Sequence, residues 1–142
     1  MEAEKMAGIK ELIRSEADGS LSFGNHTLST KTKLADFNHK GDIYKVKTFN
    51  EITRLEKNDA FVYESTPGTT VYNFEVTDDG ASFSAEADGD VQVTLDLKED
   101  TIYRVIVDGD TVGSLDTNIS GKLTFGLKLD KGAVADVIIK QA

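Results

Sequence analysis

Residues 91–97, VQVTLDL, carry an apolar side chain at every second position and a polar one in between. Successive side chains of a β-strand point to opposite faces, so this pattern places one face in a core and the other in water. Residues 123–129 and 72–76 alternate in the same way. The three stretches predict sheets that are covered on one side, which is typical of antiparallel architecture.

Two other stretches, residues 101–107 and 133–140, are apolar on both faces. We interpret them as central strands, or as strands covered on both sides. Short turn signals separate the apolar stretches, and the clearest hairpin joins residues 103–107 to 111–115 through Asp108-Gly109-Asp110. No helical segment of 10–15 residues recurs between strands, which excludes a parallel α/β sheet. We therefore expect an all-β, antiparallel β-sandwich of about nine to eleven short strands.

The amino-terminal region fits two structures. Met6, Ile9 and Ile13 fit a helical stripe, yet Ile9 and Ile13 also alternate with Glu11. We favour a hairpin of residues 9–15 with 20–25 over a short helix. This predicts an N-terminal segment over residues 1–8, with a frayed end or short helix at 1–7, before a β domain over 9–142.

Two further features of the chain leave alternatives open. Residues 50–57 are a candidate for a second short helix. Pro67-Gly68 marks a candidate subdomain boundary near residues 66–69, which would separate two small β layers.

Composition excludes several classes of protein. The 142 residues are 39% hydrophobic and 29% charged, which is ordinary for one globular domain. The absence of cysteine excludes disulfides and thiolate metal sites. The sequence has neither an apolar run long enough for a membrane-spanning helix nor the pattern of a signal peptide. We therefore expect no membrane insertion and a cytoplasmic location.

Charge is unevenly distributed along the chain. Residues 1–58 hold 10 Lys and Arg against 9 Asp and Glu, whereas residues 59–142 hold 6 against 16. The acidic half repels phosphates, so we expect no nucleic-acid partner. The split also suggests a homo-oligomer with head-to-tail contacts. The basic side would be Lys31, Lys33, Lys40, Lys45 and Lys47, and the acidic side would include Asp78, Asp79, Glu86, Asp88 and Asp90.

Catalytic signals are sparse. His39, Asp36 and one of the serines could form a triad, and His26 is the other histidine, but no G-x-S-x-G elbow is present. The string Glu86-Asp88-Asp90 offers oxygens for calcium without the EF-hand pattern. Phosphate-binding glycine loops are absent. We therefore assign no catalytic, cofactor-binding or metal-binding residue and expect no cofactor.

Most aromatic side chains lie at alternating positions and are expected in the core. Some of them could instead form a patch on which a sugar stacks, so carbohydrate is a candidate ligand. The set is Tyr44, Phe49, Phe61, Tyr63, Tyr72, Phe74, Phe83, Tyr103 and Phe125.

Four segments carry a resemblance to a known family: KELIRSEADGSLSFG at 10–24, GDIYKVKTFNEITRLEK at 41–57, YESTPGTTV at 63–71 and TNISGKL at 117–123. With them the chain resembles a family of small, largely uncharacterised clostridial proteins, over most of residues 10–139. Some members are labelled endosialidase, which implies a glycan-acting hydrolase. The carboxyl half also resembles small β-sandwich modules appended to carbohydrate-active enzymes.

The chemistry of the chain does not fit the endosialidase label well. Sialidases use an arginine cluster, a tyrosine nucleophile and a carboxylate, and nothing in the sequence places Arg14, Arg54 and Arg104 together. A sialidase propeller also needs several hundred residues. We therefore favour a non-catalytic structural or binding β module that self-associates. The alternatives are a glycan-acting hydrolase and an accessory carbohydrate- or calcium-binding module.

Overall fold

The computed structural model describes residues 8–142, which form thirteen β-strands and no helix. The strands are β1 Ile13–Ser15, β2 Leu21–Phe23, β3 Thr32–His39, β4 Asp42–Phe49, β5 Ile52–Lys57, β6 Ala60–Thr66, β7 Thr70–Thr77, β8 Gly80–Glu86, β9 Val91–Asp96, β10 Ile102–Val107, β11 Asp110–Asp116, β12 Lys122–Leu127 and β13 Val134–Gln141. The predicted all-β fold is confirmed, with more strands than the nine to eleven expected.

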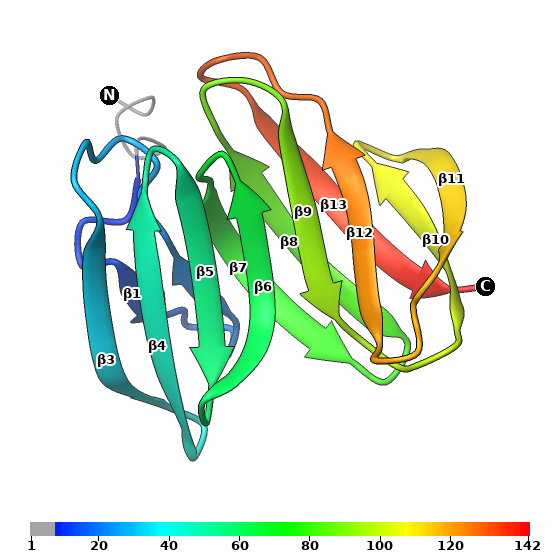
Figure 1. The fold of residues 1–142 in the computed structure, drawn as a ribbon, viewed down its shortest axis with the longest axis horizontal. Helices are drawn as coiled ribbons and strands as arrows, with labels where there is room; N and C mark the ends of the chain where they lie inside the picture. Colours follow the sequence, from blue (N-terminus) through cyan, green and yellow to red (C-terminus); the bar gives the residue numbers. More distant parts are fainter. Residues whose placement is uncertain (1–7) are drawn as a thin grey trace.

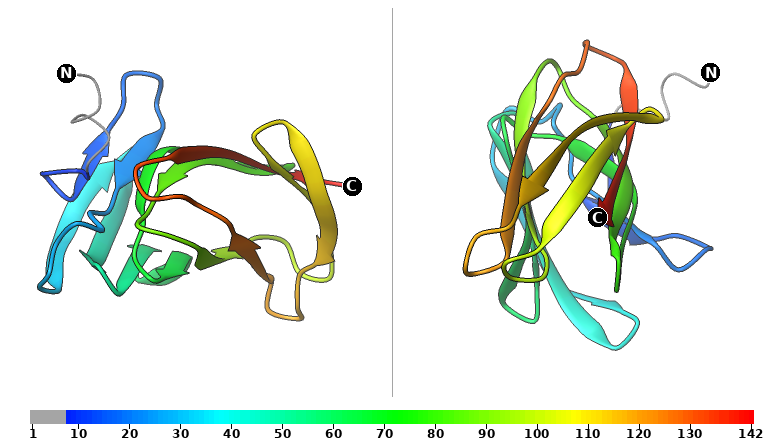
Figure 2. Two further views of the ribbon diagram at one scale, coloured as in Figure 1. Left: turned by 90° about the horizontal axis from the view of Figure 1, so that it is seen from above. Right: turned by 90° about the vertical axis from the view of Figure 1, so that its right-hand side faces the viewer.

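The strands form two antiparallel sheets that stack as the layers of a sandwich (Figures 1 and 2). The seven-stranded sheet has the order β1-β2-β7-β8-β13-β10-β11, and the six-stranded sheet has the order β12-β9-β6-β5-β4-β3. The chain crosses between the sheets several times, for example from β6 to β7. Because of these crossings, strands that are distant in sequence become neighbours.

The helix considered at residues 50–57 is not observed. Residues 52–57 form β5, which pairs with β4 and β6 and buries Thr53 and Leu55. The pairing of two neighbouring strands outweighs the weak helical propensity of this stretch. At the amino terminus, β1 and β2 form the favoured hairpin, with Ile13 opposite Phe23. Residues 1–7 lie outside the described range.

Most of the predicted core is confirmed. Seven residues at the alternating positions of β9, β10 and β12 are at most 7% exposed: Val93, Leu95, Tyr103, Val105, Leu123, Phe125 and Leu127. Val76, which alternates with Tyr72 and Phe74, is instead 50% exposed, and Tyr44, Phe49 and Phe61 are only half-buried. The two strands with apolar residues on both faces, β10 and β13, each pair with a neighbour on both sides. No second layer covers their outer face, since Ile102 is 52% and Ile138 is 45% exposed.

Four aromatic rings from both sheets meet between the layers in edge-on or tilted contacts. Tyr63 of the six-stranded sheet lies 5.2–5.9 Å, centroid to centroid, from Phe23, Phe74 and Phe83 of the other sheet. Such pairs stabilise beyond the area that they bury. Burial also raises the pKa of the Tyr63 hydroxyl to about 12.

The crossing from β6 to β7 is held by buried hydroxyl groups. Thr53 Oγ1 donates to the Thr69 carbonyl at 2.7 Å and accepts from the Thr69 N–H at 3.1 Å. Thr48 Oγ1 lies 2.8 Å from Thr53 Oγ1, and Thr69 Oγ1 lies 2.8 Å from both the Tyr63 hydroxyl and Ser65 Oγ. All five residues are fully buried, so the network connects β4, β5 and β6 to the start of β7.

We predict that Thr53→Val lowers the free energy of unfolding by about 1–3 kcal/mol, because it leaves the Thr69 N–H and carbonyl buried without partners. Urea denaturation measures this loss. Thr124→Val is the matched control, since Thr124 is exposed on β12. Equal stability of Thr53→Val and the parent would show that the network does not hold the crossing.

Candidate functional site

A groove of about 450 Å³ lies between residues of the two sheets, next to the turns of the β3–β4 and β5–β6 hairpins. These two turns are at the bottom of Figure 1. Its volume lies within the range of small-molecule sites, roughly 300–1,000 Å³. The lining comes from both layers: Gly19, Leu21, His39, Lys40, Asp42, Tyr44, Lys57, Ala60, Phe61, Val62, Phe74, Glu75, Val76 and Asp96.

Two irregularities in the sheets accompany the groove. Strand β6 pairs with β9 only over Tyr63–Thr66, so its first residues, from Ala60 to Val62, run without that neighbour. Strand β7 has a β-bulge between Tyr72 and Glu75, where Asn73 adopts a φ of 55°. A bulge redirects the side chains that follow it. Phe74 remains in the core, whereas Glu75 is exposed at the groove.

The groove combines apolar and charged walls. Leu21, Tyr44, Phe61 and Phe74 supply apolar surface, and the charged residues are Lys40, Asp42, Lys57, Glu75 and Asp96. Lys57 Nζ lies 3.7 Å from an oxygen of Asp42. Burial, aided by the nearby Asp42 carboxylate, raises the pKa of Tyr44. A site of this kind suits a ligand with both ring faces and hydrogen-bonding groups.

Phe61 lies near two cations. The Arg54 guanidinium lies 5.1 Å and the Lys122 ammonium 5.0 Å from its ring centre. Lys122 also forms an ion pair with Asp96 at 3.1 Å. The Tyr44 ring is contacted edge-on by the His39 ring at 5.9 Å and by neither of these cations, so we take Tyr44 as the candidate platform for a ligand ring.

The triad of His39 with Asp36 that was considered from the sequence, and not adopted there, is not assembled. His39 Nδ1 lies 2.6 Å from Ser15 Oγ, and Nε2 lies 3.1 Å from the Gly19 carbonyl. The carbonyl can only accept, so we assign the ring proton to Nε2 and the acceptor role to Nδ1. Asp36 is instead exposed at the bulge in β3, with a φ of 61°. His39 therefore joins β3 to β1 and the loop after it, which links the two sheets.

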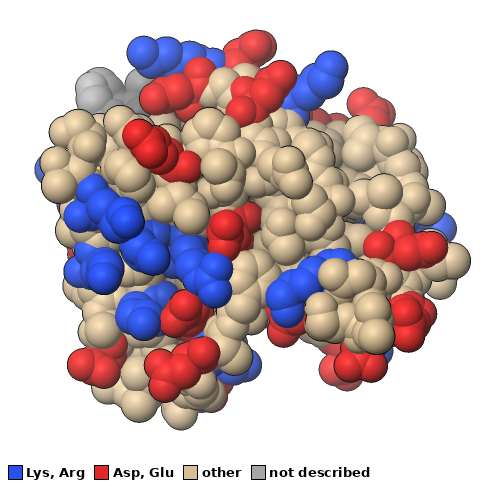
Figure 3. Space-filling view, in the orientation of Figure 1, with Lys and Arg blue, Asp and Glu red and all other residues tan. Residues whose placement is uncertain are grey.

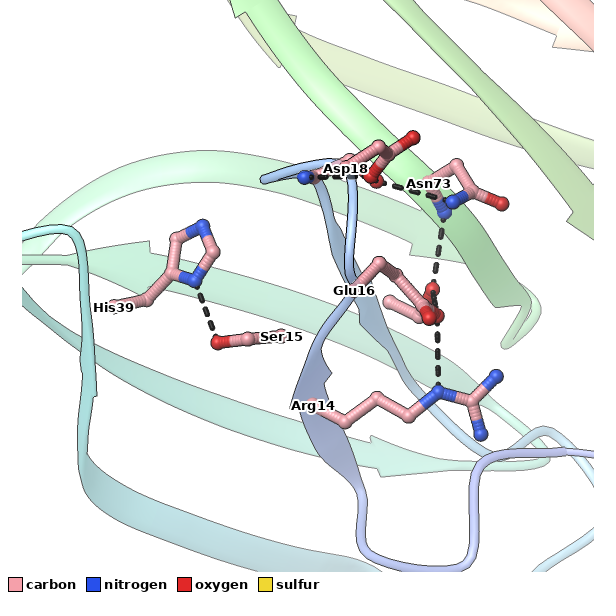
Figure 4. A network of polar contacts seen from close by, with 8 residues as sticks. Arg14, Ser15, Glu16, Asp18, His39 and Asn73 are labelled. Carbon is pink, nitrogen blue, oxygen red and sulfur yellow. Dashed lines mark hydrogen bonds and ion pairs between the residues drawn. The ribbon is translucent and has the colours of Figure 1, made fainter.

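A polar network beside His39 fixes the loop that forms one wall of the groove (Figure 4). Glu16 accepts hydrogen bonds from Ser22 Oγ and from Arg14 Nε, which lower the pKa of Glu16. Ser22 Oγ accepts from the Asn73 N–H at 3.0 Å, at the bulge of β7. The bulge and the loop are thus held in one arrangement.

The three acidic residues considered for calcium each have a different partner. Glu86 is buried and accepts from the Tyr72 hydroxyl at 3.1 Å, whereas Asp90 accepts from the Leu129 N–H at 3.0 Å. Asp88 lies 3.8 Å from Nε2 of His26, a buried histidine whose pKa is lowered by burial. No group of three or more acidic or histidine side chains within residues 8–142 could hold a metal ion.

A second polar surface lies on the outer face of the six-stranded sheet. We call Lys33, Lys45, Lys47 and Arg54 the basic face; it appears as the blue cluster at the left of Figure 3. Lys40, which the sequence analysis placed on the same basic side as these lysines, lines the groove instead. The three arginines lie on β1, β5 and β10, so they do not form the cluster that a sialidase needs.

No known protein family, no curated protein and no solved structure matches this chain. Within the described residues, no helix long and apolar enough to cross a membrane is found. The groove and the basic face are therefore interpreted from their own chemistry.

Sequence reasoning considered Tyr44 and Phe61 among many aromatic residues but did not single out the groove. Its lining is drawn from strands and turns of both sheets, and no local motif joins them. In residues 42–49, Lys45 and Lys47 alternate with Tyr44 and Val46. This pattern could have predicted a strand with one side in water and with Tyr44 on the other side.

We predict that Glu86→Gln stabilises the protein more at pH 7 than at pH 4. Burial raises the pKa of Glu86 above its ordinary 4.5. Below the pKa that Glu86 has in the unfolded chain, its carboxyl is neutral in both states and the folded protein keeps its full stability. As pH rises through the higher pKa of the folded state, the buried carboxyl must ionise and that stability is lost. Gln stays neutral and can still accept from Tyr72.

The free energy of unfolding in urea at the two pH values measures this difference. The matched control is Glu99→Gln at an exposed position. A change that is the same at both pH values would show that Glu86 is equally well accommodated in its ionised form.

Proposed function

We propose that the protein is a non-catalytic binding module that holds a carbohydrate in the groove. The observation that carries the proposal is the groove itself, with an aromatic wall and charged residues at one open end of the sandwich. Sugars offer apolar ring faces and many hydroxyl groups, so this mixture of walls complements them. Binding sites of small ligands commonly combine apolar lining with a few polar groups in this way.

The same geometry favours binding over hydrolysis. Glycoside hydrolysis needs one carboxylic acid and one carboxylate across the scissile bond. Two of the three groove carboxylates, Asp42 and Asp96, are already engaged in ion pairs with Lys57 at 3.7 Å and Lys122 at 3.1 Å. Glu86, whose pKa is raised by burial, is not part of the lining.

Self-association, the other function predicted from sequence, stays a prediction. Edge strands could pair between copies, but β1 has three residues, and the β3–β4 and β10–β11 pairs contain register shifts. Short and bulged edges disfavour such pairing, which leaves β12, six residues long and in unbroken register with β9, as the regular edge. Glu86, one of the residues expected to contact another copy, is only 6% exposed.

We predict that cellohexaose, maltohexaose or chitohexaose shifts the backbone amide signals of groove residues in heteronuclear NMR spectra. Tyr44→Ala is expected to lower the affinity for whichever sugar binds by at least tenfold, because it removes the aromatic platform. The matched control is Ile43→Ala, at the preceding position of β4 and 49% exposed. All three sugars leaving the groove signals unchanged, or their cleavage by the protein, would contradict the proposed function.

A further inference from the structure

A straight row of side chains crosses the outer face of the six-stranded sheet. The strand register places Lys33 opposite Lys47, Lys47 opposite Arg54, and Arg54 opposite Glu64. The row continues from Glu64 to Thr94 and from Thr94 to Thr124. Neighbouring strands are about 4.8 Å apart, so the row spans roughly 24 Å. It begins with three cations and ends with a carboxylate and two hydroxyl groups.

The cationic end of this row is only partly neutralised. Arg54 is paired with Glu56 at 3.1 Å and with Glu64, and Lys45 lies 3.3 Å from Glu56. Within residues 8–142, Lys33 and Lys47 take part in no ion pair. Two lysines and an arginine therefore sit directly across from one another, in a chain whose net charge is −9.

Like charges directly opposite each other on a sheet are destabilising. The arrangement of Lys33 and Lys47 therefore does not help the isolated fold, and an anion placed between them would offset the repulsion. A hollow of about 60 Å³ lies among Lys33, Lys45, Lys47, Arg54 and Glu56. A water molecule needs about 10–15 Å³ of space measured in this way, so the hollow admits a small anionic group.

The rest of the row suits a carbohydrate better than a protein. Protein interfaces are built around apolar anchors, whereas this row consists of charged residues and hydroxyl groups. The Thr94 and Thr124 hydroxyls lie 2.9 Å apart, next to the Glu64 strand. A nucleic acid is disfavoured by the net negative charge and by the small number of free cations.

We propose that this row binds an acidic glycan segment. A carboxylate or sulfate group of the glycan lies in the hollow between Lys33 and Lys47, and sugar hydroxyls follow the row to Glu64, Thr94 and Thr124. The row shares no residue with the groove, so each site can fail without the other.

The test is calorimetric titration with hexagalacturonate at low and at high salt. We expect Lys33→Gln/Lys47→Gln to weaken binding at least tenfold. The control Lys98→Gln/Lys140→Gln removes the same charge from exposed positions elsewhere and is expected to leave affinity within twofold. The melting temperature of Lys33→Gln/Lys47→Gln is not expected to fall, because the substitution relieves repulsion.

Comparison ligands separate the alternatives. Maltohexaose tests the need for charge, and hexaglutamate and a thymidine hexanucleotide test whether any polyanion suffices. Equal affinity for hexaglutamate or the oligonucleotide would overturn the assignment to a glycan. Unchanged affinity in Lys33→Gln/Lys47→Gln would overturn the site. Loss of a dimer in that variant by sedimentation would assign the surface to a second copy instead.

Tyr44→Ala distinguishes this proposal from the one for the groove. Unchanged hexagalacturonate affinity in that variant supports two separate sites. A loss as large as that of Lys33→Gln/Lys47→Gln would place the acidic glycan in the groove and overturn the assignment to the row.

Discussion

Thr69 is the residue on which the relation of the two sheets depends. Its N–H, carbonyl and hydroxyl all bond to buried groups of the six-stranded sheet, just before the chain enters β7 of the other sheet. Each buried group without a partner would cost about 1–3 kcal/mol, so the crossing has one arrangement that satisfies them all. The adjacent Gly68 is required as well, since a Cβ there would lie 2.0 Å from the Phe49 carbonyl oxygen.

This constraint acts at one end of the sandwich and the groove opens at the other. From the crossing, β6 and β7 extend to the opposite end, where Ala60 and Val76 line opposite walls. The Tyr63 and Phe74 rings, 5.9 Å apart, pack the layers together between the two ends. A groove held in this way is largely preformed, which would reduce the entropy cost of binding the ligand that we propose for it.

The outer face of the six-stranded sheet obeys a different constraint. Inward positions such as Val46 and Leu55 are fully buried, and the alternation along β4 and β5 turns Lys45, Lys47 and Arg54 outward. The packing of the core thus decides which charged side chains share a face. The register between β3 and β4 then places Lys33 opposite Lys47, so that two like charges are neighbours.

The alternation at residues 91–97 and 123–129 was sufficient to predict antiparallel strands and their buried sides, because period-two patterning is a local property. The Asp108-Gly109 turn was predictable for the same reason: its φ values of 51° and 87° suit these residue types. Strand order, the pairing of His39 with Ser15, the groove and the row from Lys33 to Thr124 were decided by tertiary structure. Each of them depends on crossings between sheets and on register, and these are set by contacts between segments far apart in the chain.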